Sequence, residues 1–213
     1  MAKLSFVRGA ITGKLGEFVG SKWKGINYIR TWSKPANPRT EGQISVRKIF
    51  KSLSLFASAL YSLDLLELIP VAAKMTERNS VFKANGVMFE DKVFTPNTMQ
   101  VAPANTRANL DSLSATVTAG KLAVNAIVNC LDKIVSGSLY AVAYDFVTGL
   151  TAGVAEAVIV DGVAQLTANL VIPSDFDFSD NAQRANCRVY VFAAGEDFDG
   201  KMLISQTFST GIA

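Results

Sequence analysis

The second half of the chain consists of short apolar runs separated by turn residues. The runs are rich in Val, Ala, Thr, Leu and Phe, and their length is typical of β-strands. They lie near residues 110–118, 122–130, 138–147, 154–160, 163–171, 186–194 and 202–208. Turn-forming pairs such as Ala119-Gly120 and Asp161-Gly162 stand between them. Short strands at nearly even spacing predict an immunoglobulin-like antiparallel β-sandwich over residues 97–213.

Helices are predicted before these strands. The segment Thr40-Glu41-Gly42-Gln43 has the residue types of a capping box, in which the first and last residues each bond the other's backbone amide. The residues that follow place apolar side chains at helical spacing on one stripe. The stripe contains Val46, Ile49, Phe50, Leu53, Phe56, Ala57 and Leu60. Two shorter helices are predicted over residues 64–74 and 76–84.

The N-terminal residues 1–34 combine many glycines with the alternation of a strand. Apolar, aromatic and basic side chains recur at every second position from Ile26 to Trp32. This pattern predicts a basic β-hairpin, and the prolines of residues 34–38 predict an extended connector after it.

Together these elements predict an α+β fold with two regions. Residues 1–96 form the basic hairpin and two or three helices, and act as an assembly or docking region. Residues 97–213 form the antiparallel β-sandwich.

The charge of the chain is divided unevenly along its length. The first 51 residues hold eleven basic and two acidic side chains, a formal charge of +9. The remaining 162 residues hold ten basic and sixteen acidic side chains, a formal charge of −6. A basic front and an acidic back indicate a docking surface for nucleic acid, for an acidic partner or for another copy of the chain.

The composition favours burial of surface between chains. Hydrophobic residues make up 49% of the sequence and charged residues only 18%, which is apolar for a soluble monomer. No uninterrupted apolar run is long enough for a membrane span. The N-terminus has no apolar segment of the secretory type, so we expect synthesis in a cytoplasm.

The residue types exclude several kinds of catalytic and metal site. The chain has no histidine, which removes the usual general base and every Ser–His or Cys–His pair. Its two cysteines, Cys130 and Cys187, are too few for a zinc site. They are predicted to be buried free thiols, with a disulfide between them as the less favoured alternative. Two acidic clusters, one around Asp177 and one around Asp197, lack the spacing of a calcium-binding loop. We therefore predict no enzyme activity, no catalytic residues, no metal and no cofactor.

One part of the sequence matches a known pattern. Residues 13–50 contain a Gly-rich stretch, then Trp-Lys-Gly, an aromatic–x–Arg strand and Asn-Pro-x-Thr-x-x-Gln-x-x-x-Arg. The matching positions are Gly16, Gly20, Trp23, Lys24, Gly25, Tyr28, Arg30, Asn37, Pro38, Thr40, Gln43, Arg47 and Phe50. This segment resembles an uncharacterised domain family of Bacteroidetes and phage proteins. The resemblance implies a structural role in virions or at surfaces, and it implies no catalytic residues.

The basic front is the candidate binding site, and three interpretations of it stay open. The candidate residues are Lys22, Trp23, Lys24, Tyr28, Arg30, Trp32 and Arg47. They could bind phosphates and stack on the bases of a single strand. Alternatively, the aromatic side chains could pack on the helix after residue 40, with the lysines in solvent. In the third interpretation the basic strands contact the acidic β-module of a neighbouring subunit.

Together with this resemblance, the charge asymmetry and the apolar composition predict a non-enzymatic structural protein, and the resemblance implies a phage-like virion as its setting. It would form a homo-oligomer and bind other virion proteins through its N-terminal region. A nucleic-acid-binding module is the alternative, and a carbohydrate-binding adhesive β-sandwich is a further one.

Overall fold

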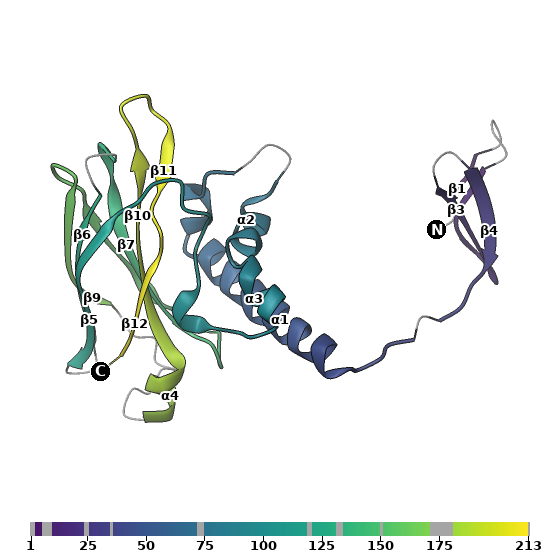
Figure 1. The fold of residues 1–213 in the computed structure, drawn as a ribbon, viewed down its shortest axis with the longest axis horizontal. Helices are drawn as coiled ribbons and strands as arrows, with labels where there is room; N and C mark the ends of the chain where they lie inside the picture. The colour runs from purple at the N-terminus through teal and green to yellow at the C-terminus, as the bar shows by residue number, and fades with distance from the viewer. Residues whose placement is uncertain are drawn as a thin grey trace. The chain divides into compact units, whose positions relative to one another are not determined.

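The structure is a computed structural model, and it contains two compact units, Met1–Thr40 and Glu41–Ala213. Figure 1 shows the strands of the first unit and the helices and strands of the second. The described residues are 3–5, 10–23, 26–34, 36–71, 75–118, 121–130, 134–149, 151–170 and 181–212.

The smaller unit is a four-stranded antiparallel sheet in the order β1-β2-β3-β4. Its strands are β1 (Lys3–Ser5), β2 (Ala10–Leu15), β3 (Phe18–Trp23) and β4 (Ile26–Thr31). The turn between β2 and β3 contains Gly16, whose φ of +57° suits a glycine. Where the sequence predicts one hairpin, the structure therefore has a sheet of four strands.

The larger unit begins with α1 (Glu41–Ser62), close to the predicted helix. Its buried side chains are Ile49, Leu53, Phe56, Ala57 and Leu60, all members of the predicted stripe. Phe50 is 57% exposed and stacks on Phe82 with ring centroids 4.8 Å apart. The helix therefore buries one face, as its pattern predicts.

Four short helical segments follow α1 before the strands begin. They are η1 (Leu65–Leu68), α2 (Glu77–Ala84), α3 (Gly86–Asp91) and η2 (Pro96–Thr98). Thr76 caps α2, because its Oγ1 accepts a hydrogen bond from the Asn79 amide at 3.3 Å. The helix predicted over 76–84 is confirmed. Of the helix predicted over 64–74, the described residues contain only the single 3₁₀ turn η1.

The strands of the larger unit form two antiparallel sheets. One sheet contains β7 (Ser136–Asp145), β8 (Thr151–Val158), β10 (Cys187–Glu196), β11 (Met202–Ile204) and β12 (Phe208–Gly211). The other contains β5 (Asn109–Thr118), β6 (Lys121–Asn129) and β9 (Val163–Leu170), in the order β5-β6-β9. A short helix, α4 (Asn181–Asn186), leads into β10.

Two hydrophobic cores lie on opposite faces of the β7–β10 sheet. Leu139 and Val191 belong to the core between the two sheets, while Tyr144, Tyr190 and Phe192 belong to the core beneath the helices. Figure 1 shows the resulting three layers, with β5, β6 and β9 on one side of β7 and β10 and the helices on the other. Because side chains alternate along a strand, β7 and β10 supply both cores at once.

The helices and strands therefore share one body. The ring of Phe56 in α1 lies 5.2 Å from that of Tyr144 and 5.4 Å from that of Tyr190. These contacts join residues on both sides of the boundary that the sequence predicts after residue 96. The structure shows a mixed α/β architecture with antiparallel sheets, and the immunoglobulin-like topology stays a prediction.

The segment between η2 and β5 is attached to β11 and β12 by side-chain amides. Asn105 accepts a hydrogen bond from the Ile204 amide at 2.7 Å, and Gln100 accepts one from the Thr207 amide at 2.8 Å. Each side chain also donates to a backbone carbonyl, that of Met202 from Asn105 and that of Thr207 from Gln100. These bonds add to the backbone hydrogen bonds that the amides of Asn105 and Thr106 donate to the Ile204 carbonyl.

Candidate interaction surface

The register of the small sheet determines which side chains share a face. Phe18 lies opposite Leu15 on one side and Thr31 on the other, and Gly20 lies opposite Ile29. Because side chains alternate along each strand, these residues form one face. We call this face the apolar face.

The apolar face carries exposed side chains. Leu15, Phe18 and Ile29 have exposed fractions of 49%, 55% and 58%. Together with Gly20 they line a hollow of about 200 Å³. Gly20 contributes no side chain, so the larger side chains form the rim of the hollow.

The opposite face carries Lys14, Tyr28 and Arg30 together with the apolar Val19 and Ile26. Arg30 lies opposite Val19, which in turn lies opposite Lys14, and Tyr28 lies opposite Ser21. The Nζ atom of Lys14 is 3.7 Å from the centroid of the Trp32 ring. We call the face formed by Lys14, Tyr28, Arg30 and Trp32 the basic face.

The structure brings together only some of the candidate residues. Tyr28, Arg30 and Trp32 lie at the basic face and are exposed. Lys22 lies opposite Asn27 and, at an even position of β3, belongs to the apolar face with Phe18.

The structure assigns the other three candidates to neither face. Trp23 ends β3, but its side chain lies outside the described residues, as does Lys24. Arg47 is exposed in α1 and thus belongs to the larger unit.

Strand β4 is exposed on both faces and along one edge. All six of its residues are exposed, and among the described residues it pairs with β3 alone. A strand edge that presents free backbone groups is a template for pairing with another chain. The small unit therefore offers two faces and an edge for contact.

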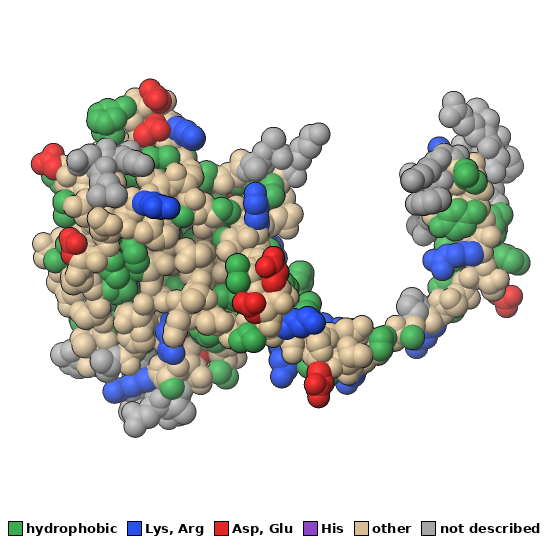
Figure 2. All heavy atoms as spheres, viewed as in Figure 1, with side chains coloured by type: hydrophobic (Ala, Val, Ile, Leu, Met, Phe, Trp, Pro, Cys, Tyr) green, Lys and Arg blue, Asp and Glu red, His purple; other side chains and the backbone are tan. Residues whose placement is uncertain are grey.

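The charge of the small unit is strongly positive. Residues 1–40 contain eight basic side chains and the single acidic residue Glu17, a formal charge of +7. Residues 41–213 contain thirteen basic and seventeen acidic side chains, a formal charge of −4. Figure 2 shows basic and apolar side chains at the surface of the small unit. The division of charge found in the sequence thus follows the division into units.

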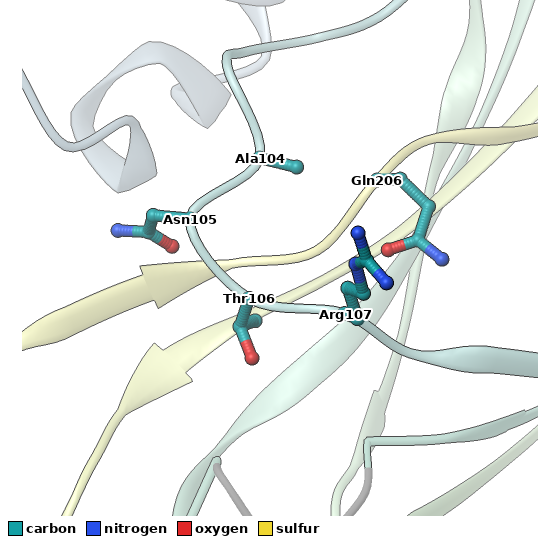
Figure 3. A pocket seen from close by; sticks show the side chains of 5 residues that line it. All are labelled: Ala104, Asn105, Thr106, Arg107 and Gln206. Atoms are coloured by element: carbon teal, nitrogen blue, oxygen red, sulfur yellow. The ribbon is translucent and has the colours of Figure 1, made fainter.

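The larger unit has a concave site between residues 104–107 and Gln206, with a volume of about 440 Å³. Arg107 is the charged residue among its lining side chains, and Figure 3 shows Arg107 and Gln206 together on one side. The Gln206 oxygen accepts a hydrogen bond from the Ala108 amide at 3.1 Å. The side-chain amides of Asn105 and Gln206 at this site form hydrogen bonds with backbone groups. The pocket is therefore typical of a place where two chain segments are held together, and less typical of an active site.

One of the two acidic clusters stabilises a turn. The Asp197 carboxylate accepts hydrogen bonds from the amides of Asp199 and Lys201, both at 2.9 Å, and so holds the turn after β10. The cluster around Asp177 lies outside the described residues.

Cys130 and Cys187 are buried free thiols, as predicted. Burial raises the pKa of both thiols, that of Cys187 to about 12.

Comparison with known proteins shows a relationship over most of the chain. Residues 10–197 match a family of unknown function, DUF6266. The chain belongs to this family. The match confirms the resemblance to an uncharacterised family. No curated protein matches the chain in sequence.

The DUF6266 match includes both units of the structure. It begins at the first residue of β2 and ends just after β10. Three of the four strands of the small sheet therefore belong to the region that defines the DUF6266 family.

The sequence did not predict two features of this DUF6266 chain: the apolar face, and the contact between Lys14 and Trp32. The alternation of Phe18 and Gly20 in one strand was a usable signal for the apolar face. The register of β3 with β4 was also needed, because it places Ile29 beside Gly20. The contact between Lys14 and Trp32 depends on the pairing of three strands, and the sequence gives no local signal for it.

Proposed function

We propose that this chain is a non-enzymatic structural subunit that assembles with copies of itself through its N-terminal sheet. The observation that carries the proposal is the exposure of β4 on both of its faces. A sheet normally buries at least one face against another layer. The missing layer would be supplied by another molecule in an assembly.

The size of the small unit supports this interpretation. A unit of about 40 residues rarely buries enough apolar surface to be stable without disulfides, metals or partners. Both cysteines of the chain lie in the larger unit, so no disulfide can stabilise the small sheet. In this proposal, contact with another molecule supplies the missing stability.

The charges favour another copy of the chain as that partner. A unit of charge +7 attracts the unit of charge −4 on a neighbouring molecule. A contact between different surfaces of identical chains repeats from copy to copy, and it produces rings or extended arrays. Such growth suits a phage-like particle, which is the setting implied by the resemblance of residues 13–50. In this proposal an immunoglobulin-like body is presented outward, and other virion proteins are further partners.

Nucleic acid is the second candidate partner, favoured by the basic face. Tyr28 and Arg30 are both exposed there, and Lys14 adds a second cation. However, Lys14 covers one side of the Trp32 ring, which reduces its use as a stacking surface. The basic face therefore supports phosphate contact better than base stacking.

Charge reversal on the basic face tests the assembly. We expect the double variant Lys14→Glu with Arg30→Glu to form smaller assemblies than the unchanged chain in low salt, by light scattering after size exclusion. The control variant, Lys121→Glu with Lys201→Glu, changes the net charge equally but alters exposed residues of the larger unit. Equal assembly by the unchanged chain and the basic-face variant would refute docking through this face.

A binding assay tests the second candidate. Binding to single- or double-stranded DNA should fall steeply with salt if the basic face contacts phosphates. The same charge-reversal variant should then lose binding, while its control retains it. Absence of binding at low salt would remove nucleic acid as a partner.

A further inference from the structure

We propose that the concave site beside Arg107 binds a small organic carboxylate. This binding does not depend on the proposed assembly, because the described residues that line the site all lie in the larger unit. The volume of about 440 Å³ is within the range typical of small-molecule sites. Three features carry the proposal: a guanidinium group without a partner, amide oxygens that are already bonded, and a buried hydroxyl group without a partner.

The cation of the site is available to a ligand. Arg107 is exposed, and in the part of the chain that the structure describes no residue forms a hydrogen bond or an ion pair with its guanidinium group. Figure 3 shows this group beside the side chain of Gln206. An arginine presents its N–H donors in a planar fork that matches the two oxygens of a carboxylate. The guanidinium group therefore favours an anionic ligand with two coplanar oxygens.

The amide side chains of the site already bind the backbone through their oxygens. Gln206 Oε1 accepts a hydrogen bond from the Ala108 amide at 3.1 Å, and Asn105 Oδ1 accepts one from the Ile204 amide at 2.7 Å. Gln206 Nε2 donates one of its two hydrogens to the Ala108 carbonyl, which leaves the second hydrogen available. Beside Arg107 the site therefore offers mainly donors, and it suits a ligand that accepts hydrogen bonds.

The backbone of this segment favours a carboxylate over a phosphate. Phosphate sites commonly present several free backbone N–H groups to the ligand. Here the amides of Asn105 and Thr106 donate to the Ile204 carbonyl, and the Ala108 amide donates to a side chain. Three of the four amides in residues 105–108 are thus occupied. The guanidinium fork is left as the main anion-binding group.

The Thr106 hydroxyl is independent evidence that a polar partner is missing. Thr106 lines the site and is 5% exposed, and its Oγ1 has no hydrogen-bond partner among the described residues. Buried hydroxyl groups are normally hydrogen-bonded, and an unpaired one costs free energy. A threonine side chain has three staggered positions. In this proposal it rotates so that the hydroxyl donates to the bound carboxylate.

Titration calorimetry of the full chain tests the proposal with acetate, succinate and citrate as probes, and with inorganic phosphate at the same ionic strength. We expect saturable binding of at least one carboxylate and weaker binding of phosphate. Arg107→Gln should weaken the binding of that carboxylate by about tenfold or more, because charge-assisted hydrogen bonds are lost. Lys121→Gln removes the same charge from another exposed position of the larger unit and should leave the affinity unchanged.

Two conservative variants test the geometry of the site. Arg107→Lys keeps the charge but has no planar fork, so it should bind the carboxylate more weakly than the unchanged chain. Thr106→Val replaces the hydroxyl with a methyl group. It should weaken binding without lowering the stability of the ligand-free protein, because the hydroxyl has no partner there. Circular dichroism in the far ultraviolet checks that each variant is folded.

Any of three results would overturn the inference. The first is the absence of saturable binding by all three carboxylates at millimolar concentrations. The second is equal affinity of the unchanged chain and Arg107→Gln, which would place the bound carboxylate elsewhere. The third is tighter binding of phosphate than of every carboxylate. The mass of the assembly is measured separately, so the proposed function can fail or hold without affecting this result.

Discussion

The ammonium group of Lys14 lies 3.7 Å from the centroid of the Trp32 ring, across the middle strand of the N-terminal sheet. Lys14 belongs to β2 and Trp32 follows the last residue of β4, so this contact joins strands that do not pair with each other. The backbone amide of Trp32 also donates a hydrogen bond to the carbonyl of Glu17 at 2.6 Å. The two contacts fix the end of β4 on the rest of the small sheet.

Removal of the Lys14 charge should weaken the small unit. A cation over an exposed aromatic ring contributes about 0.5–1 kcal/mol. We expect Lys14→Gln to lower the unfolding free energy of the small unit by about that amount, as followed by tryptophan fluorescence in denaturant. Lys34→Gln removes the same charge from an exposed position beyond the sheet and should have little effect. Equal shifts for the two variants would contradict a specific contact.

The two units should unfold separately. Trp23 and Trp32 are the only tryptophans of the chain, and both lie in the small unit. The helices and most strands lie in the larger unit, so circular dichroism in the far ultraviolet reports mainly on that unit. At low protein concentration and high salt we expect the fluorescence transition at lower denaturant than the dichroism transition. Coincident transitions would show that the chain unfolds as one body.

Because the backbones of β7 and β10 lie close together at Gly195, any side chain at this position should destabilise the larger unit. Gly137 and Gly195 are partners in the ladder, and a Cβ on Gly195 would lie 2.6 Å from the Cα of Gly137. We expect Gly195→Ala to destabilise the larger unit by about 1–3 kcal/mol or more, measured by denaturant unfolding. Gly86→Ala has nothing within 4 Å of its new Cβ and should be neutral or stabilising in its helix. Similar stability of the two variants would refute the close contact.

The sequence predicts elements well where the pattern is local. The stripe of α1 and the apolar runs of β6 and β9 depend on neighbours in the chain, and the structure has these elements near the predicted residues. The three-layered arrangement is not local. It depends on β7 and β10 burying both faces, and a strand buried on both faces loses the alternation that would indicate which side meets the helices. The shared core of Phe56 and Tyr190 therefore could not be predicted from either segment alone.

Buried thiols should make the stability of the larger unit fall at alkaline pH. The pKa of Cys187 rises to about 12, first because the thiol is buried and second because the Asp145 carboxylate is near. An exposed thiol in the unfolded chain has a pKa of about 8.5. The stability from the protonated thiol is therefore complete below about pH 8.5, and it is lost as the pH rises toward about 12.

The variant Cys187→Ala isolates this effect. Its unfolding free energy should fall less steeply between pH 8 and pH 10 than that of the unchanged chain, in denaturant titrations at each pH. The dependence should not vanish, because burial also raises the pKa of Cys130. The pKa of Tyr144 rises to about 12 as well, but its ordinary value near 10 places its effect at higher pH. Parallel curves for the two proteins would contradict the role of Cys187.

Only part of the candidate surface could be predicted from the sequence, because strand register is not a local property of the sequence. The clustering of basic residues before residue 40 is visible in the sequence and coincides with a separate unit of the structure. Which of them act together depends on strand register, which assigns Lys22 and Arg30 to opposite faces. A shift of one residue in the register would exchange these faces, so only the paired structure can assign them.

The central claim is that the N-terminal sheet assembles copies of this chain. The most direct measurement is the mass of the full-length protein by light scattering, in low salt and in high salt. The account predicts particles of several copies in low salt, which dissociate to smaller species in high salt because the docking of a basic unit on an acidic one is electrostatic. A monomer of 22.8 kDa under both conditions would contradict it.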